Sequence, residues 1–475
     1  MKLYEDIKNV LAKQNMNLVV GTIYDLQQIW LQWYRGSVND FHYYNVTCNG
    51  KQVTRERKTM NAAKMVCEEM TKLLWTERTK IELDTPEKTK KLWEILDSKR
   101  NSFTVNFPTF LEKSLAIGSG LLVEFKDSND ETIIDYINGN VIIPFKYTNS
   151  CIEGIITISR FEEGRDKNKV YYTHITIHDF NGNTYTKINE LFKSKNENEL
   201  GKRIDFASKF PGVKEVQEYQ TKTPHFQFFR PNLANNFDIN SPMGISFYAN
   251  SIDRLKSLDM KYDSFFMEFK LGKKRIMVDP TAMKATATAD ENGNVRQVQY
   301  FDSEDEVYVG INGMDGQPVK EIDFSIKAQE HIDSINADLN WLSTNLGMGS
   351  SYWKFDGEQV RTATEVISEN SKAFRTREHF AMIMIDVVYD LVRVICDLNG
   401  IQTKNIIITL DDSIIEDKDA IRLKDQQEVS IGLLSKKQYL LNRGYSEEQA
   451  IQILKEINEE KMTNQEAFGF LGDEA

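Results

Sequence analysis

The sequence is poor in cysteine, which excludes several small-domain architectures. Its 475 residues contain only four cysteines, Cys48, Cys67, Cys151 and Cys396, and none of them forms a CxxC pair. Disulfide scaffolds, zinc ribbons and thioredoxin-like redox motifs all need more closely spaced cysteines. We therefore expect ordinary reduced thiols in an intracellular protein.

Long hydrophobic runs are also missing. The most apolar stretch, residues 381–395, is interrupted by Asp386, Asp390 and Arg393, and it is shorter than the ~20 apolar residues of a membrane span. The first six residues, MKLYED, contain neither an apolar segment nor a small-residue cleavage site. The sequence therefore predicts no membrane span and no signal peptide.

Positive charge is in deficit. The chain has 59 Lys and Arg against 71 Asp and Glu, a formal net charge of −12 and a pI near 5.3. A protein that reads a nucleic-acid sequence tightly needs a net basic face, so this composition disfavours one. It is compatible with a protein that encloses nucleic acid without gripping it. The length suggests roughly three domains.

Catalytic signatures are absent from the sequence. No GxxxxGK[ST], no GxGxxG after a strand, no HExxH and no GxSxG occurs. His174 and His178 have the spacing of a helical metal pair, but the alternating pattern around them predicts a strand. In a strand they would be ~13 Å apart, too far for one ion. We therefore predict a non-enzymatic protein with no cofactor and no metal.

One enzymatic alternative stays open. Asp411, Asp412 and Glu416 could hold a metal ion in a DNA-cleaving nuclease, although carboxylates before a helix more often serve as caps. A nuclease of this kind would cleave DNA only with a metal ion, and Asp412→Ala would abolish the cleavage.

Hydrophobic periodicity divides the first half of the chain. A helix is predicted between Thr22 and Gly36, a second over residues 59–76 and a third around residues 92–96. The pattern then alternates, with asparagine–glycine turns, which predicts an antiparallel sheet. The predicted strands are residues 121–125, 141–145, 155–159 and 171–180, followed by a polar loop at 193–202.

Two unusually long helices are predicted in the second half. Ser241-Pro242 is a helix-start signature, and the apolar stripe behind it continues to Leu271, about 30 residues or ~45 Å. The second, over residues 362–398, would span ~55 Å and end at Asn399-Gly400.

Shorter segments lie between and after these helices. Residues 275–319 have strand and turn patterns, and a helix is predicted from about residue 326 to residue 345. A glycine–serine stretch that we expect to be flexible follows, and then three aromatic residues that we expect to be exposed, Tyr352, Trp353 and Phe355. Near the C-terminus two capping boxes predict short helices on either side of Gly444, namely Ser435 with Gln438 and Ser446 with Gln449. This layout suits an assembly protein more than an enzyme.

Six segments resemble the portal protein, or head-to-tail connector, of tailed bacteriophages, in the siphophage branch of Gram-positive hosts. They are residues 30–36 (WLQWYRG), 61–69 (NAAKMVCEE), 111–121 (LEKSLAIGSGL), 229–236 (FRPNLANN), 241–246 (SPMGIS) and 360–371 (VRTATEVISENS). None is a catalytic signature, and the resemblance depends on their order and their coverage of the chain.

The resemblance implies an α+β fold, mainly α-helical, with wing, stem, clip and crown regions. Its implied parts are a wing of helices and antiparallel sheet (1–240), a first stem helix (241–271), a clip (272–323), a second stem helix (324–345), a tunnel loop (346–360), a long spine helix of the wing (361–400), and a crown with the C-terminal tail (401–475).

The resemblance also implies function and partners. Portal subunits form a homo-oligomeric ring, typically a dodecamer, at one capsid vertex, and double-stranded DNA is packaged and ejected through its channel. The implied partners are the terminase large subunit, a head–tail adaptor, and the major capsid and scaffolding proteins. The location would be the virion, after synthesis in the host cytoplasm. The alternative is another virion structural or adaptor protein that lines no DNA channel.

Two groups of residues become candidates for DNA contact. The first is the tunnel loop, Gly347, Met348, Gly349, Ser350, Ser351, Tyr352, Trp353 and Lys354. The second lies near the stem–clip junction, at Lys270, Lys273, Lys274 and Arg275. Because a ring repeats every positive residue, Lys354 is the leading candidate. A merely solvated Lys354 remains an alternative, as do aromatic residues that anchor the loop.

Overall fold

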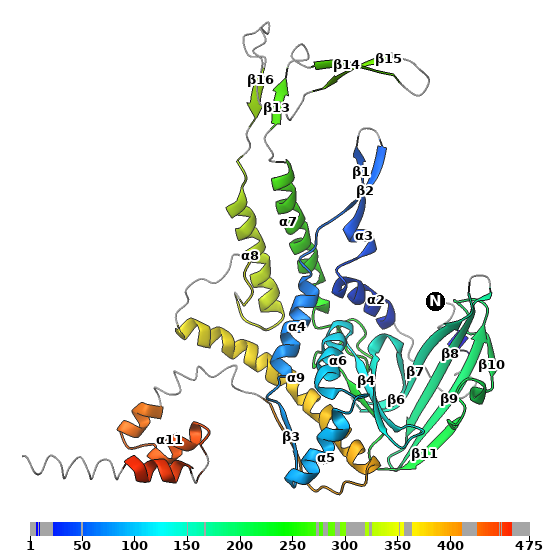
Figure 1. Cartoon of the computed structure of the whole chain (residues 1–475), viewed down its shortest axis with the longest axis vertical. Helices are drawn as coiled ribbons and strands as arrows, with labels where there is room; N and C mark the ends of the chain where they lie inside the picture. Colours follow the sequence, from blue (N-terminus) through cyan, green and yellow to red (C-terminus); the bar gives the residue numbers. More distant parts are fainter. Residues whose placement is uncertain are drawn as a thin grey trace, which may run out of the picture.

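The computed structural model describes a body of helices and sheets from which two antiparallel helices project (Figure 1). The described residues are 6–7, 9, 22–48, 51–149, 151–165, 168–271, 275–278, 284–289, 295–300, 319–322, 325–350, 352–355, 363–410, 425–445, 447 and 449–457. Helices and antiparallel sheets together confirm the expected α+β class.

The N-terminal part is mainly helical. Its elements are α2 (Ile23–Tyr34), α3 (Asn39–His42), β1 (Tyr43–Cys48), β2 (Lys51–Glu56), α4 (Ala62–Leu74), β3 (Lys80–Leu83), α5 (Pro86–Leu96) and α6 (Phe103–Ile117). The three predicted helices are confirmed as α2, α4 and α5. The β1–β2 hairpin and α6 were not predicted. Helix α6 carries Pro108 in its interior, where proline normally breaks a helix, so propensity argued against it.

Two antiparallel sheets follow. The larger has the order β10-β9-β8-β7-β6 with β11 also paired to β9, and the smaller has the order β12-β4-β5. Their strands are β4 (Gly120–Lys126), β5 (Thr132–Asn138), β6 (Ile142–Thr148), β7 (Cys151–Glu163), β8 (Val170–Phe180), β9 (Thr184–Ser194), β10 (Lys202–Ile204), β11 (Val216–Gln220) and β12 (Phe226–Phe229). The four predicted strands are confirmed as β4, β6, β7 and β8. The predicted polar loop is narrower than expected, because β9 extends to Ser194.

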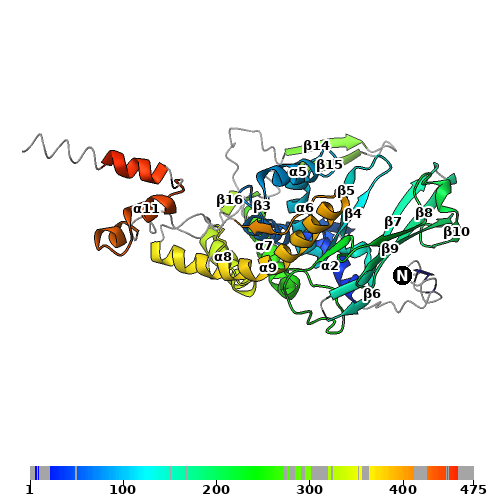
Figure 2. The ribbon, with the colours of Figure 1, turned by 90° about the horizontal axis from the view of Figure 1, so that it is seen from below.

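Helix α9 (Ala363–Leu398) organises the body, and it confirms the predicted 362–398 helix. It packs against β12, β4 and α4, and against β17 (Ile406–Thr409), which pairs with β3. The side chains of Met384, Val388 and Leu391 on this helix are fully buried. Seen from below, α9 runs through the body, with α8 and the large sheet on opposite sides (Figure 2).

The helix predicted from residue 241 begins later, and this prediction was wrong by eleven residues. The first projecting helix is α7 (Ile252–Leu271), 20 residues long. The preceding segment is irregular up to a single 3₁₀ turn at Ala249–Ser251, and it packs against the end of α6, where the Phe247 amide donates to the Leu115 carbonyl at 2.8 Å. A Cβ on Gly244 would lie 2.2 Å from the Gly118 carbonyl oxygen, so only glycine allows this approach. The apolar stripe before α7 therefore indicates buried residues and not an α-helix.

The projecting pair consists of α7 and α8, with strands beyond it. These elements are α7, β13 (Arg275–Val278), β14 (Lys284–Ala289), β15 (Val295–Tyr300), β16 (Val319–Ile322) and α8 (Ala328–Asn345). β13 pairs with β16, and β14 pairs with β15. The expected strands after residue 275 and the expected second helix are confirmed, although α8 begins two residues later than its predicted start.

Helix α7 is held from two opposite sides. Asp259 accepts hydrogen bonds from the Met60 amide at 2.8 Å, the Thr59 hydroxyl at 2.9 Å and His42 Nε2 at 3.0 Å. Arg55 donates to Asp263 at 3.0 Å, one turn further along. At 100° per residue these two carboxylates share one face of α7. They fix the β1–β2 hairpin and its flanking segment to this helix.

The opposite face of α7 holds α8. The buried Asp338 of α8 pairs with Lys261 at 2.8 Å and accepts from the Ser257 hydroxyl at 2.5 Å. Phe265 stacks on His331 with ring centroids 5.2 Å apart. Ser257 and Lys261 lie about 160–200° around the helix from Asp259. Helix α7 is therefore the middle layer between the hairpin and α8, as Figure 1 shows.

The C-terminal part contains the short helix α11 (Lys436–Asn442). The Ser435 hydroxyl accepts from the Gln438 amide, so the first predicted cap is confirmed. Gly444 follows with φ +87°. Ser446 lies outside the described residues, as do the acidic residues 411–419.

Glu124 of β4 has a carboxyl group that is buried in the core of the protein. It is 1% exposed, and neither carboxyl oxygen has a hydrogen-bond partner among the described residues. Burial raises the pKa of Glu124 well above its usual value, and the Asp390 carboxyl raises it further, while the Gln227 side chain opposes the rise. The folded chain therefore keeps this carboxyl protonated above the pH at which the unfolded chain loses the proton.

Glu124→Gln should make the stability less dependent on pH. Between the unfolded pKa near 4.5 and the higher folded pKa, only the folded chain holds the proton, so stability falls as pH rises, by up to about 1.4 kcal/mol per unit. The variant lacks this fall. We expect its melting temperature, relative to the original chain, to increase from pH 5 to pH 8. The exposed Glu218→Gln is the control, and equal pH profiles for the original chain and Glu124→Gln would contradict the prediction.

Asp259→Ala should destabilise the fold strongly. The change removes the acceptor for three groups and leaves His42 without its buried partner, which costs about 3 kcal/mol or more. The matched control is Asp253→Ala on the same helix, whose side chain is 95% exposed, with an expected cost under about 0.5 kcal/mol. Urea unfolding measures both, and equal losses would show that the carboxylate does not fix the hairpin.

Candidate functional site

The tunnel loop expected after α8 is fixed at its start. Gly347 has φ +73°, its amide donates to the Thr344 carbonyl at 3.1 Å, and the Met348 amide donates to the Ser343 carbonyl at 2.9 Å. This pair of bonds is a Schellman motif, which closes a helix with glycine in the left-handed conformation. The Met348 side chain is fully buried behind it.

A hydrogen bond ties this loop to α9. The Thr376 hydroxyl donates to the Gly347 carbonyl at 2.7 Å. A Cβ on Gly347 would lie 2.5 Å from that hydroxyl, so no larger residue fits without a shift. The expectation of a flexible glycine–serine stretch is therefore wrong for Gly347 and Met348. Ser351 and residues 356–360 lie outside the described residues.

The aromatic residues of the loop anchor it rather than project from it. The Tyr352 hydroxyl donates to Glu69 of α4 at 2.8 Å, and burial raises the pKa of this tyrosine. The Phe355 amide donates to the Asn336 side chain at 2.8 Å, and its ring contacts Phe265. The expected exposure of these aromatics was wrong. Trp353 and Lys354 are half-buried as well.

The second group of candidates lies at the other end of the helix pair. Lys270 is exposed in the last turn of α7, and Arg275 begins β13. Because α7 and α8 are antiparallel, the end of α7 and the loop after α8 are separated by most of the helix length, on the order of 25 Å. The structure therefore does not bring the two groups together. Lys273 and Lys274 lie outside the described residues.

Two basic residues that sequence reasoning missed face the tunnel loop. A cavity of about 610 Å³ is lined by the end of α8, the loop and α9, through Thr344, Gly347, Gly349, Ser350, Lys372, Arg375 and Thr376. Lys372 and Arg375 are polar positions between the apolar residues of the long helix. The hydrophobic periodicity of this helix therefore predicts only that they are exposed to solvent. Their position beside the loop follows from the fold.

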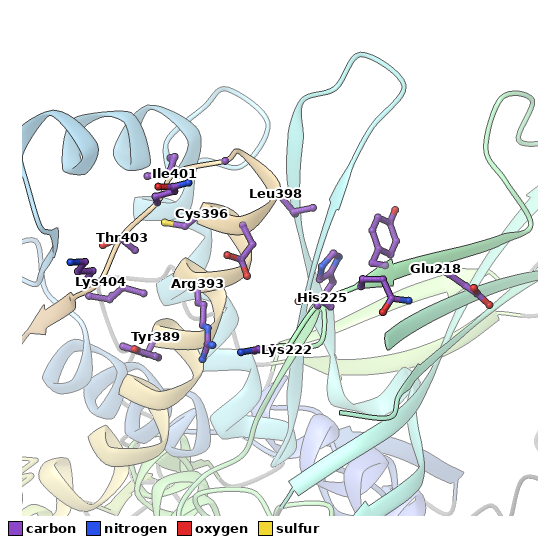
Figure 3. A pocket seen from close by; sticks show the side chains of 17 residues that line it. Glu218, Lys222, His225, Tyr389, Arg393, Cys396, Leu398, Ile401, Thr403 and Lys404 are labelled. Atoms are coloured by element: carbon purple, nitrogen blue, oxygen red, sulfur yellow. The ribbon is translucent and has the colours of Figure 1, made fainter. Parts of the chain in front are cut away.

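A larger cavity lies elsewhere in the described part of the chain. Its volume is about 950 Å³, and it lies between the β11–β12 connection and the C-terminal end of α9 (Figure 3). Its lining includes the cations Lys222, Arg393 and Lys404. Burial lowers the pKa of His225 to about 4, and burial raises the pKa of Cys396 to about 11. At neutral pH neither residue is charged, so this cavity offers no activated thiolate and no imidazole base poised near pH 7.

The two histidines of β8 have structural roles. His178 is buried, lies 2.7 Å from the Tyr185 hydroxyl, and has a pKa well below its usual value because of burial. His174 contacts Asn189 at 3.1 Å. Within the described part of the chain, no three His, Cys, Asp or Glu side chains are placed to hold a metal ion. Asp411, Asp412 and Glu416 are not among those residues.

No helix in the described ranges has both the length and the apolar character needed to cross a membrane.

Gly347→Ala should cost more stability than Gly400→Ala. Both glycines follow a helix in the left-handed conformation, at φ +73° and +64°, where a Cβ costs about 1–2 kcal/mol. A Cβ on Gly400 meets nothing within 4 Å, whereas one on Gly347 would be 2.5 Å from the Thr376 hydroxyl. Thermal unfolding measures the difference. Equal losses would mean that the loop is not held against α9.

Two solved structures resemble this fold only distantly. The first is described as the neck of a native GTA particle computed with C12 symmetry, with 12% sequence identity and a TM-score of 0.39. The second is described as the neck of an empty GTA particle computed with C6 symmetry, with 10% identity and a TM-score of 0.40. In both cases the match covers 81% of this chain and 88% of the other. These values are too low to carry a conclusion. No curated protein matches the sequence.

The family comparison covers nearly the whole chain. The model described as "Phage portal protein, SPP1 Gp6-like" matches residues 24–466. This range includes both projecting helices, the loop between α8 and α9, and all of α9. It also includes the six segments whose resemblance to phage connectors was noted in the sequence. The chain therefore belongs to the phage portal protein family, a family of structural proteins that connect head and tail.

Proposed function

We propose that this chain is the subunit of a ring-shaped portal at one vertex of a phage capsid. Double-stranded DNA enters and leaves the capsid through the central channel of the ring, which has twelve subunits in the particle. The family match over residues 24–466 carries this proposal. The siphophage and Gram-positive assignment depends on the sequence resemblance.

Each region of the chain has a place in this proposal. Helices α7 and α8 form the stem, β13 to β16 the clip, and residues 346–360 the tunnel loop. The body formed by the N-terminal helices, the sheets and α9 is the wing. Because β17 pairs with β3, this strand belongs to the body, and the residues after it form the crown and tail. The packaging motor's terminase large subunit docks on the clip during packaging, and the head–tail adaptor binds later. The wing contacts the major capsid and scaffolding proteins.

The layered arrangement of the stem supports ring formation. The hairpin lies on one side of α7 and α8 on the other, so the two exposed sides of this three-layer unit differ. Identical subunits with two different sides associate head to tail, and such contacts close into a ring when the rotation between neighbours fits. The outer side of α8 exposes Glu330 and Asp333, which leaves surface for a neighbour.

The acidic composition suits a channel through which DNA slides. A net charge of −12 per subunit keeps the affinity for phosphate low across most of the surface. DNA that must move in both directions needs few and weak contacts.

Purified protein should form closed rings with an axial hole. Negative-stain images at several salt and protein concentrations test this expectation. Images of monomers or open filaments alone would contradict the proposal, and solid assemblies without a hole would favour an adaptor that lines no channel. Asp259→Ala is a useful comparison, because loss of the hairpin position should lower the fraction of closed rings.

A further inference from the structure

The cavity between the tunnel loop and α9 has an unusual lining for this protein. The seven described residues that line it supply two cations, three hydroxyl groups and two glycines, and none of these seven is a carboxylate. The chain as a whole has twelve more acidic than basic residues, whereas these described lining residues carry a formal charge of +2. We call this surface the loop cradle.

The loop cradle is built from elements that hold one another in place. Lys372 and Arg375 are three residues apart on α9, so they lie on the same face of the helix. The Thr376 hydroxyl, one residue further, holds the Gly347 carbonyl at 2.7 Å. The opposite wall is backbone with positive φ, at +73° for Gly347 and +98° for Gly349. Glycine at position 347 lets the loop backbone approach the Thr376 side chain of α9, where a Cβ would lie 2.5 Å from the hydroxyl oxygen.

This chemistry fits a phosphate group. Arginine presents a planar set of five N–H donors, and lysine adds a compact charge, so the pair suits a tetrahedral anion with several oxygen acceptors. Ser350 lies on the same lining, and its hydroxyl group can donate a further hydrogen bond, whereas the Thr344 hydroxyl already donates to the Asn340 carbonyl at 2.9 Å. Arg375 also takes part in an interaction within the chain, and a guanidinium group has five N–H donors.

We propose that the loop cradle binds a phosphate group of the DNA backbone as the duplex passes the tunnel loop. This inference depends on the proposed portal function. It assigns the phosphate contact to Lys372 and Arg375 of α9 rather than to Lys354, which is half-buried among the anchored aromatics. Such a contact does not depend on the base sequence of the DNA, because the phosphate is the same at every base pair.

The test measures DNA binding by assembled rings. Fluorescence anisotropy follows a labelled 30-base-pair duplex at several salt concentrations, with the rings checked by negative stain in the same samples. For Lys372→Ala/Arg375→Ala we expect intact rings, at least tenfold weaker binding near 100 mM salt, and a smaller slope of log affinity against log salt. The slope falls by about 0.9 for each phosphate that the protein no longer neutralises. Lys372→Arg/Arg375→Lys keeps the charge and should restore most of the affinity.

Controls separate this inference from the portal proposal. Lys90→Ala/Lys91→Ala removes two exposed cations from α5 and should change the affinity less than twofold. Unchanged affinity and slope in the Lys372→Ala/Arg375→Ala rings would overturn the loop cradle while leaving the ring proposal standing. A failure of the original chain to form rings counts against the portal function itself and, with it, against this inference. If inorganic phosphate stabilises the original chain against heat more than the variant, but duplex binding is equal, the site binds the free ion and the DNA assignment is wrong.

Discussion

The structure depends on how helix α7 is held by buried charges on two opposite faces. Asp259 and Asp263 fix the β1–β2 hairpin to one face, and Asp338 of α8 pairs with Lys261 on the other. Burying a carboxylate is unfavourable unless partners surround it. Each of these interactions therefore fixes the position of one element relative to α7 and contributes to the stability of the fold. One helix thereby sets the place of the hairpin, of α8 and of the strands that follow α7.

The position of the tunnel loop follows from the same constraint. Because α8 is fixed against α7, its C-terminal Schellman motif brings Gly347 to α9, where the Thr376 hydroxyl closes the contact. Tyr352 then reaches Glu69 on α4, which ties the loop to the N-terminal helices. The loop is thus attached to three separate elements, α8, α9 and α4.

The sequence predicted the elements with a strong regular period and missed those shaped by tertiary contact. The 36 residues of α9 repeat one apolar stripe without proline or glycine, so their helix was predictable. Residues 241–248 have a similar stripe, but they are buried in irregular form against α6, and periodicity alone cannot separate the two cases. The loop residues were found from their glycines, whereas Lys372 and Arg375 look like any solvated helix face. Their role depends on which loop lies opposite, which is a property of the fold.

The contrast between an acidic chain and a basic loop cradle has a physical consequence for a DNA channel. At physiological salt the screening length is about 8 Å, so charges on distant surfaces neither cancel nor reinforce the attraction at the cradle. In the proposed ring, each subunit would offer one local, weak site for phosphate, and these sites would be equivalent by symmetry. A phosphate of an advancing duplex would leave one subunit while another phosphate reached the next, so the total free energy would change little. Repetition of a weak site around a ring is therefore compatible with DNA that slides and is not held at one position.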